Sequence, residues 1–261
     1  MGSELSAGLR LWRTRRRVSQ LELAIRAGTT QRHVSFIESG RSAPGREMVI
    51  RLAESLQVPL RERNALLLAG GYAPAYDETP YDAPGLEAVR TALAAILEGH
   101  RPYPAVVVDR IGNLVLANHA FDVLTAGVAE HLLTAPVNLP RLLLDPAGLA
   151  PRIVNFAQWS WHVIDALTRE AAQYPSPSSD ALIQELIAVI PPRPAPDHLG
   201  FAVPLQLRSP DGDLHLVTTL TRFGTAIDVT VSELRMEAFL PADEPTARAL
   251  RGLDRTMLQR V

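Results

Sequence analysis

Hydrophobic residues over positions 1–76 recur every three or four residues, which is the spacing of amphipathic helices. Ser19 followed by Glu22 forms a capping box that predicts a helix start. Gly28 predicts a tight turn after that helix, because glycine adopts positive φ without strain. The predicted helices cover residues 9–16, 20–27, 30–39, 46–56 and 60–72. Together they predict an all-α bundle of five helices.

Beyond residue 85 helical stretches alternate with short runs that have the period of two residues typical of strands. Three segments rich in Asp and Gly predict turns or breaks: DRIGN at 109–113, SPDGD at 209–213 and FGTAID at 223–228. The predicted elements are a helix over 86–100, strands at 106–108 and 114–117, helices within 136–191, three strands within 198–241 and a helix over 243–258. This order predicts an α+β, PAS-like domain with an antiparallel five-stranded sheet and a helical insertion.

Residues 73–85 read APAYDETPYDAPG and separate the two patterns. The segment is rich in Pro, Tyr and acidic residues and has no period, which is typical of a linker. A chain of 261 residues is long enough for two domains that each bury a core. We therefore predict a multidomain chain, with a first domain at 1–76, a linker at 77–85 and a second domain at 86–261.

Composition narrows the class of protein. The chain is 47% hydrophobic and 21% charged, contains no apolar run of bilayer length, and has no cysteine. It begins without an apolar leader, which predicts a cytoplasmic location. The sequence shows no GxSxG, P-loop or HExxH motif, and its seven histidines lack metal-ligand spacing. We expect no catalysis, no metal and no required cofactor.

Charge is distributed unevenly between the two predicted domains. Residues 1–76 hold 12 Arg and 6 Glu, a net charge of +6, whereas the remainder holds 14 Arg and 22 acidic residues, a net charge of −8. A basic domain is the expected footprint of a surface that binds DNA phosphates, although a solvated basic face has the same composition.

The segment GTTQRHVSFIESGRSAPG at 28–45 decides between these readings. It strongly resembles the phage-repressor (Cro/C1, XRE-type) helix-turn-helix family, as does the order of Gln20, Ala24, Gly28, Val34, Ile37, Glu38 and Gly40. The resemblance implies a lambda-repressor-like domain that binds double-stranded DNA, with its third helix in the major groove. It also implies a structural ion pair between Arg13 and Glu38.

Mapping the family onto this chain gives the residues expected to contact DNA. Gln pairs with adenine and Arg with guanine, so Gln31 and Arg32 are expected to specify bases, each by about 1–3 kcal/mol. The other reading positions implied by the family are Thr30, Ser35 and Phe36. The residues that fall where the family contacts phosphate are Gln20, Arg41 and Arg46.

The resemblance extends over nearly the whole chain. The segment VDRIGNLVLANHAF at 108–121 resembles the opening hairpin of a PAS-like domain. The stretches that resemble the MmyB-like regulators are 30–74, WSWHVIDAL at 159–167, 219–224 and SELRMEAFLPADE at 232–244. The resemblance implies a sequence-specific transcription regulator whose PAS-like domain holds a long-chain, fatty-acid-like ligand.

The residues themselves suggest where such a ligand would bind. An aromatic helix facing a sheet rich in Val and Leu can enclose an apolar cavity for an acyl chain, although core packing explains the same pattern. A carboxylate head group would need a polar partner, for which Arg152, His162 and Arg222 are available, each with a structural role as the alternative. The predicted ligand contacts are Phe156, Trp159, Trp161, His162 and Arg222.

Two functions fit these features. The first is a regulator that binds a palindromic operator as a homodimer and changes its dimer geometry when the ligand binds. The second is a co-regulator or antitoxin-type protein whose C-terminal domain binds a partner protein. The length and the PAS-like strand order of that domain favour the first.

Overall fold

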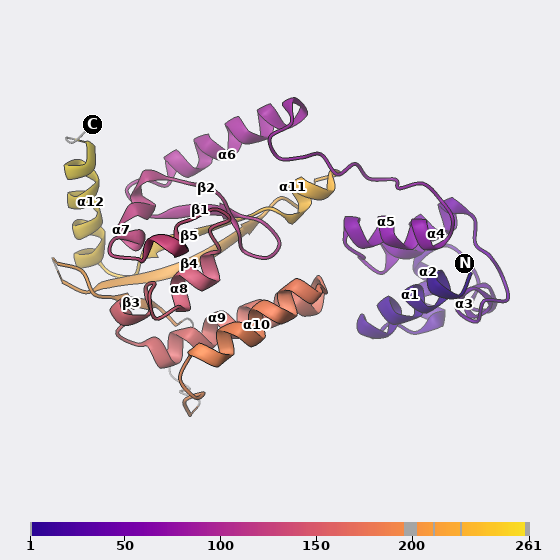
Figure 1. Ribbon diagram of the computed structural model, residues 1–261. Coiled ribbons are helices and arrows are strands. Elements are labelled where there is room, and N and C mark those ends of the chain that lie inside the picture. The colour runs from indigo at the N-terminus through magenta and orange to yellow at the C-terminus, as the bar shows by residue number, and fades with distance from the viewer. Residues whose placement is uncertain (1, 196–202, 211, 225, 259–261) are drawn as a thin grey trace. The chain divides into compact units, whose positions relative to one another are not determined.

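The computed structural model in Figure 1 describes residues 2–195, 203–210, 212–224 and 226–258. The chain divides into two compact units, of which the first comprises Met1–Tyr81 with Gly224–Ser232 and the second comprises Asp82–Phe223 with Glu233–Val261. Among the described helices, none is both long and apolar enough to span a bilayer.

The first unit contains the five helices that the sequence predicts. The Oγ of Ser19 accepts a hydrogen bond from the backbone N–H of Glu22 at 3.0 Å, and Gly28 has a φ of +62° in the turn that follows. The unit's buried core includes Leu9, Trp12 and Ile37. Its helices are α1 (Gly2–Arg15), α2 (Gln20–Arg26), α3 (Gln31–Glu38), α4 (Arg46–Ser55) and α5 (Leu60–Ala69).

The second unit is built on a five-stranded sheet in the order β2-β1-β5-β4-β3, with every neighbouring pair antiparallel. Its strands are β1 (Ala105–Val108), β2 (Leu114–Ala117), β3 (Leu205–Leu207), β4 (Leu214–Arg222) and β5 (Arg235–Pro241). This strand order, with the helical insertion between β2 and β3, confirms the predicted PAS-like fold. The start of the predicted strand region, residues 198–202, lies outside the described residues, as do Asp211 and Thr225 in the predicted breaks.

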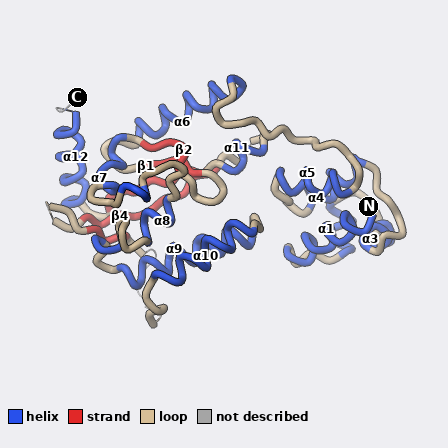
Figure 2. Tube along the Cα trace, in the orientation of Figure 1, coloured by secondary structure: helices blue, strands red, loops and turns tan. Residues whose placement is uncertain are grey.

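Helices cover both faces of this sheet. Figures 1 and 2 show α6 along one face and α9 with α10 along the other. Burial of all four residues of the interior strand β1 follows from this double cover. The helices of the unit are α6 (Glu87–Gly99), α7 (Asp122–Thr125), α8 (Leu139–Leu144), α9 (Phe156–Gln173), α10 (Pro177–Val189) and α12 (Glu244–Leu258).

The segment between β4 and β5 differs from the prediction. Residues 229–241 follow the predicted break and lie in the predicted strand region, but their first part forms a short helix, α11 (Val229–Glu233), although Val and Thr favour strands. The carboxylate of Asp228 accepts from the N–H of Val231 at 3.2 Å, and the hydroxyl of Ser232 donates to the carbonyl of Val229 at 2.7 Å. This local capping overrides the strand preference, and β5 begins only at Arg235.

The predicted linker is partly held in place. Asn64 on α5 donates through Nδ2 to the carbonyl of Tyr76 at 2.7 Å, so the first part of the linker packs on the helical bundle. Further along, the linker is hydrogen-bonded to the α11 segment: the N–H of Val229 donates to the carbonyl of Asp77 at 2.8 Å and the N–H of Thr79 to the carboxylate of Asp228 at 3.1 Å. The segment at 224–232 therefore belongs to the first compact unit.

Candidate DNA-binding surface and ligand pocket

Helix α3 presents its first turn to solvent. Thr30 caps it, since its Oγ1 accepts from the N–H of His33 at 3.2 Å. Val34 and Ile37 are each 1% exposed and anchor the opposite face in the core. With that face fixed, Gln31 and Arg32 are exposed. The structure thus places the two predicted base-reading side chains where a DNA groove could receive them.

Phe36 is half-buried and lies close to two arginines. The guanidinium carbon of Arg32 is 5.1 Å from the centre of the Phe36 ring, and that of Arg41 is 5.9 Å away. Both distances are within the range of cation–π attraction. The ring of Phe36 therefore contacts both Arg32, which is predicted to read a base, and Arg41, which is predicted to contact phosphate. Arg46 is exposed at the start of α4, and Ser35 is half-buried on α3.

Glu38 connects α3 to the two helices that precede it, α1 and α2. Arg13 on α1 donates to both carboxylate oxygens of Glu38, at 2.6 and 2.9 Å, which confirms the expected ion pair. Gln20, predicted to contact phosphate, donates through Nε2 to the same carboxylate at 2.8 Å. Burial by itself would raise the pKa of Glu38, but the hydrogen bonds from Arg13 and Gln20 outweigh it and hold that pKa below its usual value. Gln20 is thus part of the scaffold that holds α3.

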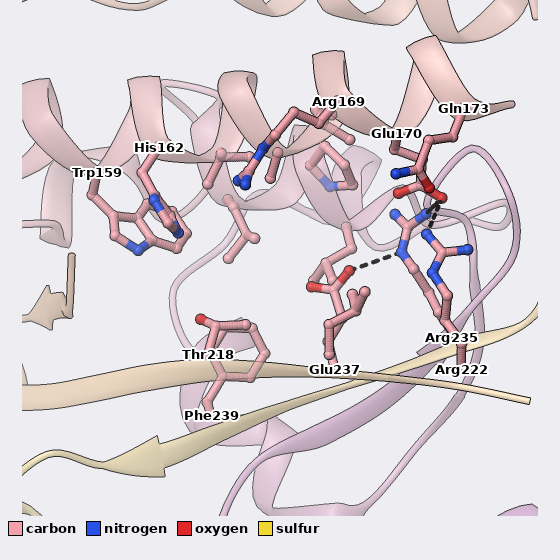
Figure 3. A pocket seen from close by; sticks show the side chains of 17 residues that line it. Trp159, His162, Arg169, Glu170, Gln173, Thr218, Arg222, Arg235, Glu237 and Phe239 are labelled. Carbon is pink, nitrogen blue, oxygen red and sulfur yellow. Dashed lines mark hydrogen bonds and ion pairs between the residues drawn. The ribbon is translucent and has the colours of Figure 1, made fainter. Parts of the chain in front are cut away.

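A pocket of about 460 Å³ lies in the second unit between α9 and strands β4 and β5. Figure 3 shows the helix side chains on one wall and the strand side chains on the other. Side chains two residues apart on a strand share a face, so each strand contributes every second residue. The strand residues that line the pocket face each other in register as Thr218 with Phe239, Leu220 with Glu237 and Arg222 with Arg235.

One end of the pocket is apolar. Trp159 of α9 and Phe239 of β5 lie there, with Leu139 and Leu143 of α8 also among the lining residues. Trp159 is 2% exposed and Phe239 is fully buried, so this end is held by the domain core. It can accept a hydrocarbon group.

The other end of the pocket is charged. Glu170 of α9 accepts with Oε1 from both Arg222, at 2.8 Å, and Arg235, at 2.7 Å (Figure 3). Arg235 also donates through Nε to Glu237 at 3.1 Å. Burial raises the pKa of Glu237 above its usual value, and the nearby Arg235 offsets this only in part. The pocket therefore joins an apolar end to two guanidinium groups, of which that of Arg235 is buried and that of Arg222 is partly exposed.

The predicted ligand contacts divide into two groups. Trp159, His162 and Arg222 line the pocket, and burial lowers the pKa of His162, which favours its neutral form. Phe156 and Trp161 lie on the same helix but outside the set of lining residues. The Nε1 of Trp161 donates to the carbonyl of Pro191 at 2.9 Å, and Phe156 packs against the domain core.

Arg152 has a structural role. Its guanidinium donates to the backbone carbonyls of Ala126 at 2.8 Å, Val123 at 3.2 Å and Arg208 at 3.3 Å. It ties loops of the second unit together and does not line the pocket.

Four charged pocket residues, Arg169, Glu170, Arg235 and Glu237, were missed by sequence reasoning. Charged residues on a strand usually indicate a solvated face, and nothing in the sequence places β4 beside β5 in a given register. A signal was present, however, because Arg235, Glu237 and Phe239 follow each other at the period of one strand face.

The family model for the MmyB-like transcription regulator ligand binding domain matches residues 89–253, well over half of the chain. The chain belongs to the MmyB-like transcription regulators. A model described as helix-turn-helix matches residues 9–63 of this MmyB-like regulator. The protein is therefore a DNA-binding transcription regulator with a C-terminal ligand-binding domain.

Further comparisons add little about this MmyB-like regulator. No curated protein matches it. A solved structure described as "Structure of an RNA-binding Light-Oxygen-Voltage Receptor" is 18% identical and superposes with a TM-score of 0.25, covering 99% of this chain and 64% of that chain. The MmyB-like chain thus spans less than two thirds of that protein, and we assign neither fold nor function from it.

Proposed function

We propose that this regulator binds a palindromic operator as a homodimer and that an amphiphile resembling a fatty acid, held in the pocket of the PAS-like domain, controls that binding. The observation that carries the ligand proposal is the pocket itself, in which an apolar end adjoins the guanidinium groups of Arg222 and Arg235. An acyl chain fits the first feature and a carboxylate fits the second.

The proposed DNA contacts follow from exposure and chemistry. Gln31 and Arg32 are exposed on the first turn of α3 and carry the side chains best suited to adenine and guanine. The exposed Arg41 and Arg46 follow α3 and carry the positive charge that phosphate contacts need. Homodimers of helix-turn-helix proteins read two half-sites about one helical turn apart, which gives the operator its palindromic form.

The alternative is a co-regulator or antitoxin-type protein whose second domain binds a protein partner. A pocket lined by arginines and aromatic side chains supports a small molecule instead, because docking of a protein partner does not require such a pocket.

The ligand proposal can be tested with the purified full-length protein. Mass spectrometry of an organic extract should detect a long-chain acid, and saturated fatty acids should raise the melting temperature of delipidated protein, because a ligand that binds the folded state stabilises it. The same acid should change the affinity for a selected operator fragment. Repeated absence of any bound small molecule, together with no thermal shift, would contradict the proposal.

A further inference from the structure

Glu237 has an unusual position in the pocket. It lies opposite Leu220 in the middle of the three strand pairs, between the pair Thr218 and Phe239 and the arginine pair. Successive pairs are about 6.8 Å apart along a strand, so a carboxylate bound at the arginines would come close to Glu237. Its side chain is 15% exposed, and Figure 3 shows its carboxylate directed into the pocket.

Glu237 belongs to a cluster in which two arginines, Arg222 and Arg235, contact two carboxylates. On α9, Glu170 pairs with both Arg222 and Arg235. Arg169 and His162 of the same helix also line the pocket, and burial lowers the pKa of His162, which favours its neutral form. Near Arg235, Arg110 and Glu233 form an ion pair with 3.6 Å between Nη1 and Oε1, so their charges offset each other. With Glu237 ionised, Arg222 and Arg235 are matched by two carboxylates, and Arg169 adds a third positive charge to the lining. With Glu237 neutral, the Arg222–Arg235 pair itself carries one further positive charge for a ligand.

We propose that Glu237 sets the charge specificity of the pocket: an anionic head group binds at Arg222 and Arg235 as Glu237 takes up one proton from solvent. The inference rests on the proposed ligand function, and it assigns to that site a proton-coupled preference for anionic amphiphiles. The balance is one proton added to the carboxylate of Glu237 and one negative charge brought in by the ligand, so the net charge of the cluster is unchanged.

Two physical effects act in the same direction. Two carboxylates that share a small site cannot both stay ionised without a large electrostatic penalty, so the ligand's charge favours protonation of Glu237. The acyl chain removes water from the pocket and strengthens that repulsion. Burial already raises the pKa of Glu237 in the free protein, so less free energy is needed to complete its protonation.

The proposal predicts a defined pH dependence. Between the pKa of Glu237 in the free protein and its higher pKa in the complex, binding takes up one proton and the Kd rises by about tenfold per pH unit. Below this range Glu237 is protonated in both states, and above it in neither. Fatty acids titrate themselves, so decyl sulfonate, which keeps its negative charge throughout, is the suitable probe.

The experiment is calorimetric titration of the delipidated full-length protein with decyl sulfonate below its micelle concentration, from pH 5.5 to 8.5. Pairs of buffers with different ionisation enthalpies give the number of protons taken up. We expect an uptake approaching one proton for the wild type. Glu237→Gln should show almost none, with affinity independent of pH and at least tenfold tighter than the wild type at pH 8.

The matched control is Glu185→Gln, which removes a carboxylate on α10 that is about half exposed, pairs with Arg141 and does not line the pocket. It should keep the wild-type pH dependence. Decanol, which has the chain but no charge, should bind with a smaller proton uptake than the sulfonate.

The outcomes distinguish the proposed role of Glu237 from the proposed binding of an amphiphile in the pocket. Sulfonate binding by the wild type without proton uptake, equal uptake with decanol, or an unchanged pH slope in Glu237→Gln overturns the role of Glu237 and leaves the ligand pocket standing. Failure of every amphiphile to bind overturns both. If Glu237→Gln does not fold, the proton uptake measured for the wild type in the paired buffers still tests whether binding is coupled to protonation.

Discussion

Glu38 shows how a single residue can hold a recognition surface without touching DNA. Its side chain is 5% exposed and receives hydrogen bonds from α1 and α2, so three helices meet at one carboxylate. Because its pKa is lowered on folding, the ionised form contributes stability above the pKa of the unfolded chain. That contribution disappears as the pH falls through the lower pKa of the folded state.

Glu38→Gln should therefore destabilise the helical unit by about 2 kcal/mol at neutral pH, the range for hydrogen bonds to charged groups. The difference from the wild type should shrink on acidification, as measured by urea unfolding at several pH values. Glu22→Gln is the control, since Glu22 pairs with Arg26 and both are about half exposed, and it should change stability by no more than about 0.5 kcal/mol. A difference that grows in acid would contradict the assignment.

At the same scale, single side chains should separate base reading from phosphate contact. Gln31→Ala and Arg32→Ala should each relax preference at one operator position by about 1–3 kcal/mol in a binding-site selection. Arg46→Ala should instead weaken all sites alike and reduce the salt dependence of binding by about one counterion. Uniform loss from all three variants would refute the proposed reading positions.

Among the secondary-structure elements, the β4–β5 pair determines the chemistry of the pocket. The register that places Arg222 opposite Arg235 also places Thr218 opposite Phe239, so the charged and apolar ends come from the same two strands. A slip by one residue would turn every one of these side chains to the other face of the sheet.

A tryptophan at Leu220 tests the role of this strand face. Leu220 lines the pocket and is 53% exposed, so Leu220→Trp should fit without disturbing the core and should weaken amphiphile binding at least tenfold. Thr221→Trp places the same bulk on the other face of β4 and should leave binding unchanged. Ligand titration followed by thermal unfolding would measure both, and equal effects of the two variants would argue against the pocket.

Across the whole molecule, two compact units are assembled from interrupted stretches of sequence. The segment Gly224–Ser232 belongs to the first unit although both strands that flank it belong to the second. Asp228 is central to this arrangement, since one carboxylate oxygen accepts from Thr79 and the other from Val231.

Asp228→Ala should remove both acceptors, cost about 1–2 kcal/mol locally, and expose the linker at 77–81 to proteases. Limited proteolysis with mapping of the cleavage sites would measure this, with Asp213→Ala, in the exposed turn before β4, as the control. Cleavage of the linker at the same rate in wild type and variant would show that these hydrogen bonds do not protect it.

The sequence by itself determined the helical unit, the PAS-like strand order and the family. Those features depend on local capping, as at Ser19 and Thr30, and on a periodicity that each segment carries alone. Only the tertiary structure decided that α11 is a helix, that Trp161 lies outside the pocket, that Gln20 binds Glu38, and that Glu170, Arg235 and Glu237 come together. Helix α11 is capped locally by Asp228 and is also hydrogen-bonded to the linker at Asp77 and Thr79. Each of the other features depends on a partner distant in sequence, and the register and packing that supply it arise only when the chain is folded.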